Sequence, residues 1–425
     1  MTAEQVEEQT GLGSRFRRVT LDLTPVRSSR PFRNLLIGDA VSVVGTQVTA
    51  VAIPLQVYAL TRSAAAVGLV GVAGLVPLIV FGLYGGAVAD AVDRRKLVLV
   101  TTTLQAGLSA VLLAQALAGA RSTLLLYLVV AVQAGLFALD SPARQAFVPR
   151  LLPPNLLPAA NALRQVEFNV GMALGPLLAG VLVGTVGFWS AYGLDAVSFT
   201  ASLWAVASLP SMAPEGGGRR AGLASVVEGL AFLATRKVLL LTFVVDIIAM
   251  VFGMPRALFA PLSDQVFDGG PSTAGAMYSA LAAGALVGAL FGGWFGRVHR
   301  QGIAVLAAIV AWGGCIVLFG LTGQLWLALL LLAGAGAADM VSAVFRSAIL
   351  QTAAPDGMRG RLGGVFIVVV AGGPRLGDAR SGGMASWVGL QGSVVVGGVL
   401  VIGLTLLVAV LVPRFAGYDS RHPEP

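Results

Sequence analysis

A chain of 425 residues that is 56% hydrophobic and only 11% charged is too apolar for an ordinary soluble protein, which carries about a quarter charged residues. The net charge of +8 does not indicate nucleic-acid binding, because the cations lie in short segments between long apolar runs, where they set membrane orientation. One cysteine excludes an intrachain disulfide, and the two histidines, in a loop and a tail, argue against a metal centre. We therefore expect an integral membrane protein with no metal and no cofactor.

The first segment, 1–31, is polar, lacks the apolar core of a signal peptide, and is predicted to be a cytoplasmic tail. Apolar runs of about 20 residues or more, long enough for a helix to cross a bilayer, then recur along the chain. They lie at 34–60, 64–89, 96–119, 122–146, 156–184, 186–209, 238–262, 272–296, 301–321, 325–350, 361–387 and 391–412. This pattern predicts an all-α integral membrane fold of twelve transmembrane helices.

The longest internal connection, 210–237, divides the twelve runs into two sets of six. We therefore predict two pseudo-symmetric six-helix bundles, 32–209 and 238–413, followed by a second tail, 414–425. Within the connection, the apolar residues Leu223, Val226, Val227, Leu230 and Leu233 share one helical face. This spacing favours an amphipathic helix on the membrane surface, and the alternative is a continuation of the seventh span.

Lysine and arginine accumulate in every second loop. These loops contain Arg94, Arg95, Lys96, Arg144, Arg150, Arg219, Arg220, Arg236, Lys237, Arg297, Arg300, Arg359 and Arg361. The remaining loops carry little beyond Arg62 and Arg121. Because cytoplasmic loops carry the excess of cations, we expect a multi-pass protein of the cell (inner, cytoplasmic) membrane with both termini in the cytoplasm.

The first span carries a stripe of polar residues spaced by three, four, three and seven, which places them on one helical face. The stripe consists of Asp39, Ser42, Thr46, Thr49 and Gln56. Polar groups inside a span do not face lipid without a penalty, so we expect the stripe to line a central cavity. The alternative is hydrogen bonding between helices, which explains the hydroxyl residues well and Asp39 poorly.

The seventh span carries two charged residues, Asp246 and Arg256, which are about 15 Å apart along a helix and so cannot pair directly. Gly253 and Pro255 beside Arg256 predict a bent or broken helix. An arginine at such a bend could bind an anionic group of a substrate. Equally, Arg256 could extend to the outer membrane interface.

Further candidate residues lie on three other spans. On the fourth and tenth spans, Arg144 and Arg346 occupy repeat-related positions and are interpreted first as structural charges of an inner gate, and second as substrate contacts. Arg375 and Asp378 are three residues apart and could neutralise each other, in a span whose sequence Gly372-Gly373-Pro374 is typical of a broken helix. The remaining candidates for the substrate cavity are Gln133, Asp140 and Asp339.

Two motifs resemble signatures of the major facilitator superfamily. The segment 86–96 (GAVADAVDRRK) resembles its loop signature between helices two and three. The segment 171–180 (GMALGPLLAG) on the fifth span is similar to the glycine–proline motif of its antiporters. The enterobactin-exporter-like branch is the closer match, through 140–144 (DSPAR), 157–161 (LPAAN), 256–261 (RALFAP), 350–361 and 377–379 (GDA).

The resemblance implies conformational roles for residues of both motifs, namely Gly86, Asp90, Arg94, Arg95, Gly171, Gly175, Pro176 and Gly180. Asp90 would pair with loop cations or with the positive N-terminus of the eleventh span near Gly360 and hold the inner side closed. The alternative is that the loop cations only set the topology. The chain departs from the superfamily at Val130, where an arginine linked to proton coupling often stands, and at Arg297, which stands opposite Asp90 in the second half.

These patterns predict a secondary transporter, not an enzyme, that exports a small amphipathic molecule by alternating access in exchange for protons. Asp39 and Asp246 are the proposed proton carriers. The expected partners are a small-molecule substrate, protons and the lipid bilayer, and we expect a monomer. The alternatives are a broad-specificity drug (macrolide-type) efflux pump with no siderophore role, and a facilitator without proton coupling. No Walker loop is present, so ATP is not expected to drive transport directly.

Overall fold

The computed structural model describes residues 22–213, 228, 231–353, 356–419 and 421 of the chain. The regular structure of these residues is helical throughout. In the first half the helices are α2 (Thr24–Ser28), α3 (Arg30–Thr61), α4 (Ala64–Ala91), α5 (Arg94–Leu117), α6 (Thr123–Gln145), α7 (Phe147–Leu151), the short η1 (Pro154–Leu156), α8 (Leu157–Thr185) and α9 (Phe188–Ala207).

In the second half the main helices are α11 (Lys237–Ile247), α12 (Phe259–Gln265), α13 (Gly270–Leu290), α14 (Gln301–Leu321), α15 (Leu325–Ala353), α16 (Asp356–Val388), α17 (Leu390–Leu411) and α18 (Pro413–Ala416). Three short non-α segments connect them: η2 (Ile248–Phe252), η3 (Arg256–Leu258) and η4 (Gly292–Arg297). Ten described stretches are long and apolar enough to cross a membrane. With α9 and α16 at the positions of the sixth and eleventh spans, the chain has the predicted all-α membrane fold.

Local sequence signals set the ends of the spans. Serines cap the starts of α3, α4 and α6: the side chains of Ser29, Ser63 and Ser122 each accept a hydrogen bond from a backbone N–H three residues later. Gly119 and Gly187, with φ of 65° and 113°, allow the tight turns that separate spans three from four and five from six. Most long apolar runs between such signals fold as single helices, and the seventh is an exception.

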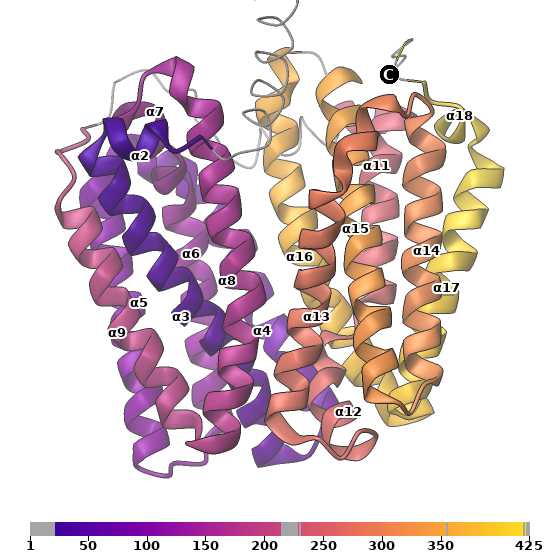
Figure 1. The fold of residues 1–425 in the computed structure, drawn as a ribbon, viewed down its shortest axis with the longest axis horizontal. Helices are drawn as coiled ribbons and strands as arrows, with labels where there is room; N and C mark the ends of the chain where they lie inside the picture. Colours follow the sequence, from indigo (N-terminus) through magenta and orange to yellow (C-terminus); the bar gives the residue numbers. More distant parts are fainter. Residues whose placement is uncertain (1–21, 214–227, 229–230, 354–355, 420, 422–425) are drawn as a thin grey trace, which may run out of the picture.

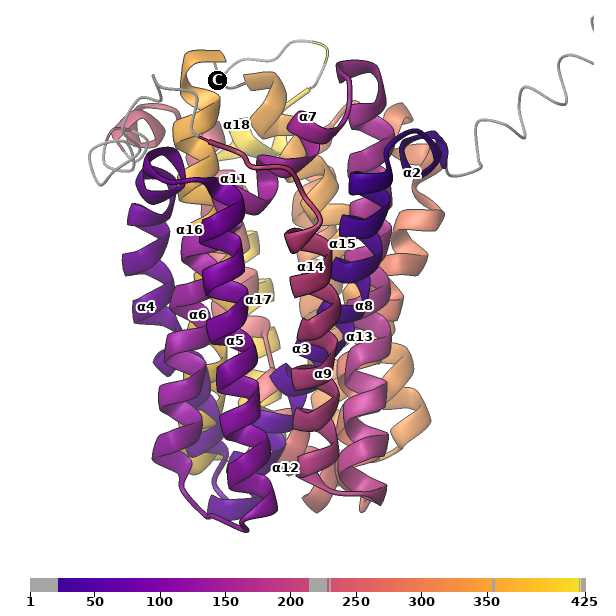
Figure 2. The same cartoon turned by 90° about the vertical axis from the view of Figure 1, so that its left-hand side faces the viewer.

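Two bundles stand side by side in Figure 1, with α2–α9 on the left and α11–α18 on the right. We call them the N-bundle and the C-bundle. In the N-bundle α3 packs against α8 and α9, and α4 packs against α6; in the C-bundle α14 packs against α15 and α17. Figure 2 views the molecule from the N-bundle side, where α5 and α9 are neighbours. The bundles contact each other mainly through α4 with α16 and through α8 with α13.

The molecule has two ends, which we name the terminal face and the far face. The terminal face carries α2, α7 and α18 at the top of Figure 1, and the far face carries α12 at the bottom. The side-chain hydrogen bonds that join described residues of the two bundles lie toward the far face. They connect Tyr58 with Asp264 and Gln265, Arg62 with Asp264, and Ser272 with the carbonyl of Gly180. The two bundles are therefore held together at the far face.

The seventh span is interrupted, as Gly253 and Pro255 predict: α11 gives way to the π-helical η2, the 3-10 helix η3, and then α12. The prediction of a broken eleventh span was wrong, because α16 continues through Pro374 from Asp356 to Val388. The glycines there serve close packing instead. A side chain at Gly377 would collide with the carbonyl of Met250 in η2, so α16 approaches the interrupted span at backbone contact.

Most of the predicted amphipathic helix of the connection lies outside the described residues. The exception on its apolar face is Leu233, within the helical residues 231–235, which is buried in the C-bundle core.

Candidate functional site

An arginine-centred cluster of charges lies in the terminal half of the N-bundle. Arg144 of α6 contacts Asp39 of α3 (Nη1 to Oδ1, 3.2 Å) and Asp140 of its own helix (Nε to Oδ2, 3.0 Å). Its Nη2 also donates to the hydroxyl of Thr102 on α5, at 2.6 Å. Arg144 therefore links three helices, and the sequence spacing of four residues between Asp140 and Arg144 accounts for only one of these contacts.

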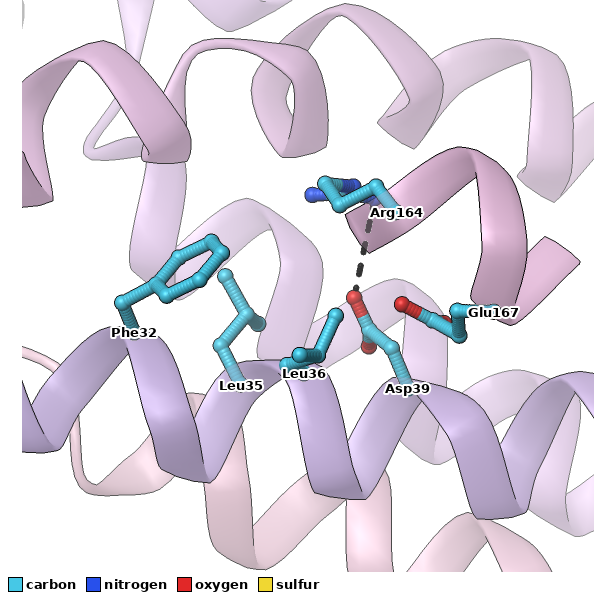
Figure 3. Close-up of a pocket in the computed structure, with 6 residues that line it drawn as sticks. All are labelled: Phe32, Leu35, Leu36, Asp39, Arg164 and Glu167. Carbon is cyan, nitrogen blue, oxygen red and sulfur yellow. Dashed lines mark ion pairs between the residues drawn. The ribbon is translucent and has the colours of Figure 1, made fainter. Parts of the chain in front are cut away.

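A second arginine and a third carboxylate complete the cluster. Arg164 of α8 approaches Oδ2 of Asp39 at 3.7 Å. Figure 3 shows Glu167, one turn along the same helix, beside Asp39 in a small pocket closed on one side by Phe32. The Oε2 atom of Glu167 is buried and has no hydrogen-bond partner in the part of the chain that the structure describes. Three carboxylates thus share two guanidinium groups, which leaves one negative charge in excess when all are ionised.

The C-bundle carries the related arrangement on α11 and α15. Arg346 Nη1 contacts Asp246 Oδ1 at 2.6 Å, and its Nε donates to Ser342 at 3.1 Å. Ser342 stands four residues before Arg346, where the N-bundle has Asp140 before Arg144. The second carboxylate is supplied by Asp339, 4.0 Å from Arg346 Nη2.

Asp339 is the most accessible carboxylate of this second cluster. Its side chain retains 41% of its accessible surface although it lies in the middle of α15. Because an ionised side chain is costly against hydrocarbon, a partly exposed carboxylate at this depth is not expected to face lipid.

The residues of the polar stripe on the first span lie in different surroundings. Asp39 joins the cluster described above, while Thr49 donates to Asp195 of α9 at 2.8 Å. Gln56 accepts hydrogen bonds from Gln115 of α5 at 3.0 Å and from Tyr192 of α9 at 2.6 Å. Thr49 and Gln56 therefore lie inside the N-bundle, not against the C-bundle, and follow the alternative of helix-to-helix hydrogen bonding. Helical spacing identifies residues that share a face, but not the helix that covers each part of it. Within the same stripe, Ser42 is buried and Thr46 is exposed.

Arg256 lies at the junction of the two bundles, within the interrupted seventh span. Its neighbours Ala257 and Ala260 pack into the core of the N-bundle. The carbonyl of Arg256 accepts a hydrogen bond from Tyr278 at 2.9 Å. Arg256 is half-buried, and its guanidinium forms no salt bridge with the described residues, although the charge of nearby Asp378 acts on it.

The expected pairing of Arg375 with Asp378 is not formed. Arg375 donates to the carbonyl of Ala371 at 2.6 Å, and Asp378 accepts from the backbone N–H of Ala257 at 3.1 Å. The side chain of Arg375 lies over Gly74 of α4, so it too faces the other bundle. On the fourth span, Gln133 is partly buried.

The loop 92–93 between α4 and α5, at the terminal face, is anchored to its own bundle. Asp90 pairs with Arg94 at 3.1 Å, and Arg95 donates to the carbonyl of Ala207 at 2.6 Å. Asp93, which the sequence interpretation missed, caps α5 and also accepts from Ser211 and from the N–H of Met212. Burial alone would raise the pKa of Asp93, but these hydrogen bonds outweigh it and lower the pKa below its usual value. The side chains near Gly360, the other predicted partner of Asp90, lie outside the description.

Small residues of the second motif, and Gly85 beside the first, act as close-packing positions. Gly85, beside Gly86, lies against the backbone of α6 at Ala138. On α8, Gly171 and Gly175 lie against Val43 and Gln47 of α3.

One turn further along α8, the same motif contacts the C-bundle. Gly275 of α13 lies against the carbonyl of Pro176 and against Gly180. The motif therefore joins α3 to one side of α8 and the C-bundle to the other, toward the far face.

The sequence interpretation also missed Asp195, which is buried at the centre of α9 with an exposed fraction of 1%. The signal that selected Asp39, a carboxylate within an apolar run, applies equally to Asp195 in the run 186–209.

Comparison with known proteins identifies the family to which this chain belongs. A family model described as "Transmembrane secretion effector" matches residues 20–424. The chain belongs to this family of major facilitator transporters. It is therefore a multi-pass membrane transporter, not an enzyme.

A relative in Shigella boydii serotype 18, named as an enterobactin exporter, is 31% identical over 410 residues, which cover 93% of this chain and 95% of the relative. Among solved structures, the nucleoside transporter NupG superposes with a TM-score of 0.70 at 15% identity, covering 92% of this chain and all (100%) of that one. A peptide-bound POT family transporter also gives a TM-score of 0.70 at 15% identity, covering 91% of this chain and 96% of that one. At these identities the solved structures support the shared fold alone.

Proposed function

We propose that this transporter exports a small amphipathic anion from the cytoplasm in exchange for protons, by alternating access between its two bundles. The terminal face, with its excess of Lys and Arg in the loops, is assigned to the cytoplasm. The far face is then the outer side. The hydrogen bonds at the far face support the proposal that the conformation described is closed on the outer side, the state that loads cargo from the cytoplasm.

The observation that carries the proposal is the pair of guanidinium groups between the bundles. Arg256 and Arg375 come from two spans of the C-bundle, both lie where it meets the N-bundle, and neither forms a salt bridge with a described carboxylate. Guanidinium groups bind carboxylates, phosphates and similar planar anions by charge-assisted hydrogen bonds. A catecholate siderophore fits this chemistry, and the Shigella relative is named as an enterobactin exporter.

Proton exchange is proposed to take place at the two arginine-centred clusters. In the N-bundle, Asp39 and Glu167 compete for Arg164 and Arg144, so one added proton balances the charge of the cluster. Asp246 is the corresponding carboxylate of the C-bundle, and it shares Arg346 with Asp339. Protonating Asp39 or Asp246 would release its arginine, which changes the charge that the terminal half of each bundle presents to an anion.

Alternating access is proposed to separate the far-face contacts and close the terminal face. The separation would break the exposed pair Arg62–Asp264 and part the glycines of α8 and α13. Closure would bring Asp90 toward the start of α16, as the loop signature implies. Arg144 and Arg346, at repeat-related positions, would stay within their own bundles as rigid supports.

Transport into inside-out vesicles tests the coupling. With an acidic interior imposed, the wild type should accumulate a catecholate siderophore, and Asp39→Asn combined with Asp246→Asn should abolish the dependence on the pH gradient. Asp268→Asn, an exposed far-face carboxylate in the left-handed conformation that asparagine tolerates, is the matched control. Accumulation that survives collapse of the gradient in the wild type would identify a facilitator and refute proton exchange.

A cargo panel tests the anion site. Arg256→Gln should reduce transport of the anionic siderophore at least tenfold, with Arg121→Gln on the exposed far-face loop as control. Efflux of neutral macrolides with no siderophore transport would instead identify the broad-specificity drug pump. Equal loss of anionic and neutral cargo in Arg256→Gln would mean that Arg256 has a structural role.

A further inference from the structure

Asp195 is surrounded by hydroxyl groups in the interior of the N-bundle. Its Oδ2 accepts hydrogen bonds from Thr49 Oγ1 on α3 at 2.8 Å and from Ser109 Oγ on α5 at 2.6 Å. Both donors are themselves buried, and the Oδ1 atom of Asp195 is buried with no hydrogen-bond partner among the described residues. Two neutral donors and one unpartnered oxygen are a poor environment for a full negative charge.

No cation of the described helices compensates Asp195. The helices packed against α9 are α3, α5 and α8. From Leu97 to its end, α5 carries no charged residue, and α3 carries none between Asp39 and Thr61. Asp39 itself is ten residues from Thr49, or about 15 Å along the helix.

The remaining ionisable groups near α9 have other partners. On α8 the charged residues are Arg164 and Glu167, which lie in the cluster around Asp39. On α9 the nearest titratable side chain is Tyr192, which donates to Gln56. Asp195 thus differs from Asp39, Asp140 and Asp246, each of which contacts an arginine.

We infer that Asp195 binds a proton and is a neutral carboxylic acid in this conformation. Protonation at Oδ1 leaves Oδ2 free to accept both hydroxyl hydrogen bonds. It also removes the charge, whose burial without a counter-ion is strongly unfavourable. Burying the resulting O–H without an acceptor costs less free energy than burying a carboxylate without a partner.

The site is connected to the moving parts of the transporter through α3. Thr49 belongs to the helix that carries Asp39 toward the terminal face and Tyr58 at the far face. Loss of the proton would place a charge at the contact of α3 with α9. A role in coupling rests on the proposed export mechanism, whereas the protonation itself does not.

Infrared spectroscopy of the full chain in lipid nanodiscs tests the protonation, with the spectrum of each variant subtracted from that of the wild type. At neutral pH the wild type should show a carboxylic-acid C=O band that shifts in D₂O. The band should be lost in Asp195→Asn and kept in Asp264→Asn, which removes an exposed, salt-bridged carboxylate. A spectrum unchanged by Asp195→Asn would overturn the inference.

A second variant leaves the carboxyl group in place. Ser109→Ala removes one hydrogen bond to Oδ2, so the same C=O band should move to higher wavenumber. If this variant leaves every carboxylic-acid band where it was in the wild type, Asp195 is not the protonated group. Because neither measurement involves transport, failure here is distinct from failure of the export assay.

Discussion

Replacing Arg144 by methionine should be among the most destabilising single changes in the N-bundle. The substitution keeps an unbranched apolar stem but removes the guanidinium that contacts Asp39 and Asp140. The side chains of those carboxylates are 8% and 1% exposed, so water cannot replace the lost partner. Both would remain in the protein interior with too little positive charge.

The magnitude follows from the two short contacts. At separations of 3.2 and 3.0 Å, and with an effective dielectric constant of about 20, each attraction is on the order of 5 kcal/mol before desolvation is subtracted. Arg164, at 3.7 Å, continues to compensate Asp39, and the stranded carboxylates can take up protons. We therefore expect a loss of about 3–5 kcal/mol in the free energy of unfolding, as for other buried pairs that lose one partner.

Equilibrium unfolding in detergent micelles at neutral pH, followed by circular dichroism, measures this loss. The variant Arg144→Met with Asp39→Asn and Asp140→Asn removes the stranded charges and should recover at least half of the stability. Arg121→Met on the exposed far-face loop should change stability by less than about 0.5 kcal/mol. A cost below about 1 kcal/mol for Arg144→Met, or a triple variant no more stable than the single one, would refute the electrostatic reasoning.

Three further predictions concern the two faces. Asp93→Ala should cost about 1–2 kcal/mol in unfolding free energy, and Asp93→Asn less, because the amide can still cap α5. Folding lowers the pKa of Asp93 below its usual value of 3.8. The contribution of its ionised form to the free energy of unfolding is therefore complete at neutral pH and is lost as the pH falls through the lowered pKa. The unfolding free energies of wild type and Asp93→Ala should therefore converge in acid, and a constant difference would contradict this assignment. Gly275→Leu should hold α8 and α13 apart, because Gly275 lies against Gly180. Spin labels placed across the far face should then report a longer distance than in the wild type. An unchanged distance would mean that the close approach of these two glycines does not control closure of the far face. Arg62→Ala removes an exposed ion pair with Asp264, so cysteine accessibility at the far face should rise by no more than about fivefold, and a larger rise would make this pair a main latch.

Helical spacing predicts only some of the ion pairs that form within one helix. The i,i+4 pair of Asp140 with Arg144 follows from the sequence, and so does the relation of Arg144 to Arg346 through the internal repeat. The i,i+3 pair expected for Arg375 and Asp378 does not form, because backbone groups at Ala371 and Ala257 satisfy these side chains instead. Local spacing permits a contact, but the neighbouring helices decide whether it is made.

The sequence alone determined the membrane fold, the division into two related halves, the ends of most spans and the interruption near Gly253 and Pro255. These properties depend on hydropathy, capping residues and turn residues that act over a few positions of the chain. The tertiary structure alone decided that Asp39 contacts Arg144, 105 residues away, that Thr49 contacts Asp195, 146 residues away, and that α16 remains continuous. Such contacts depend on which helices are neighbours and on their relative rotation, and no local pattern in the sequence contains that information.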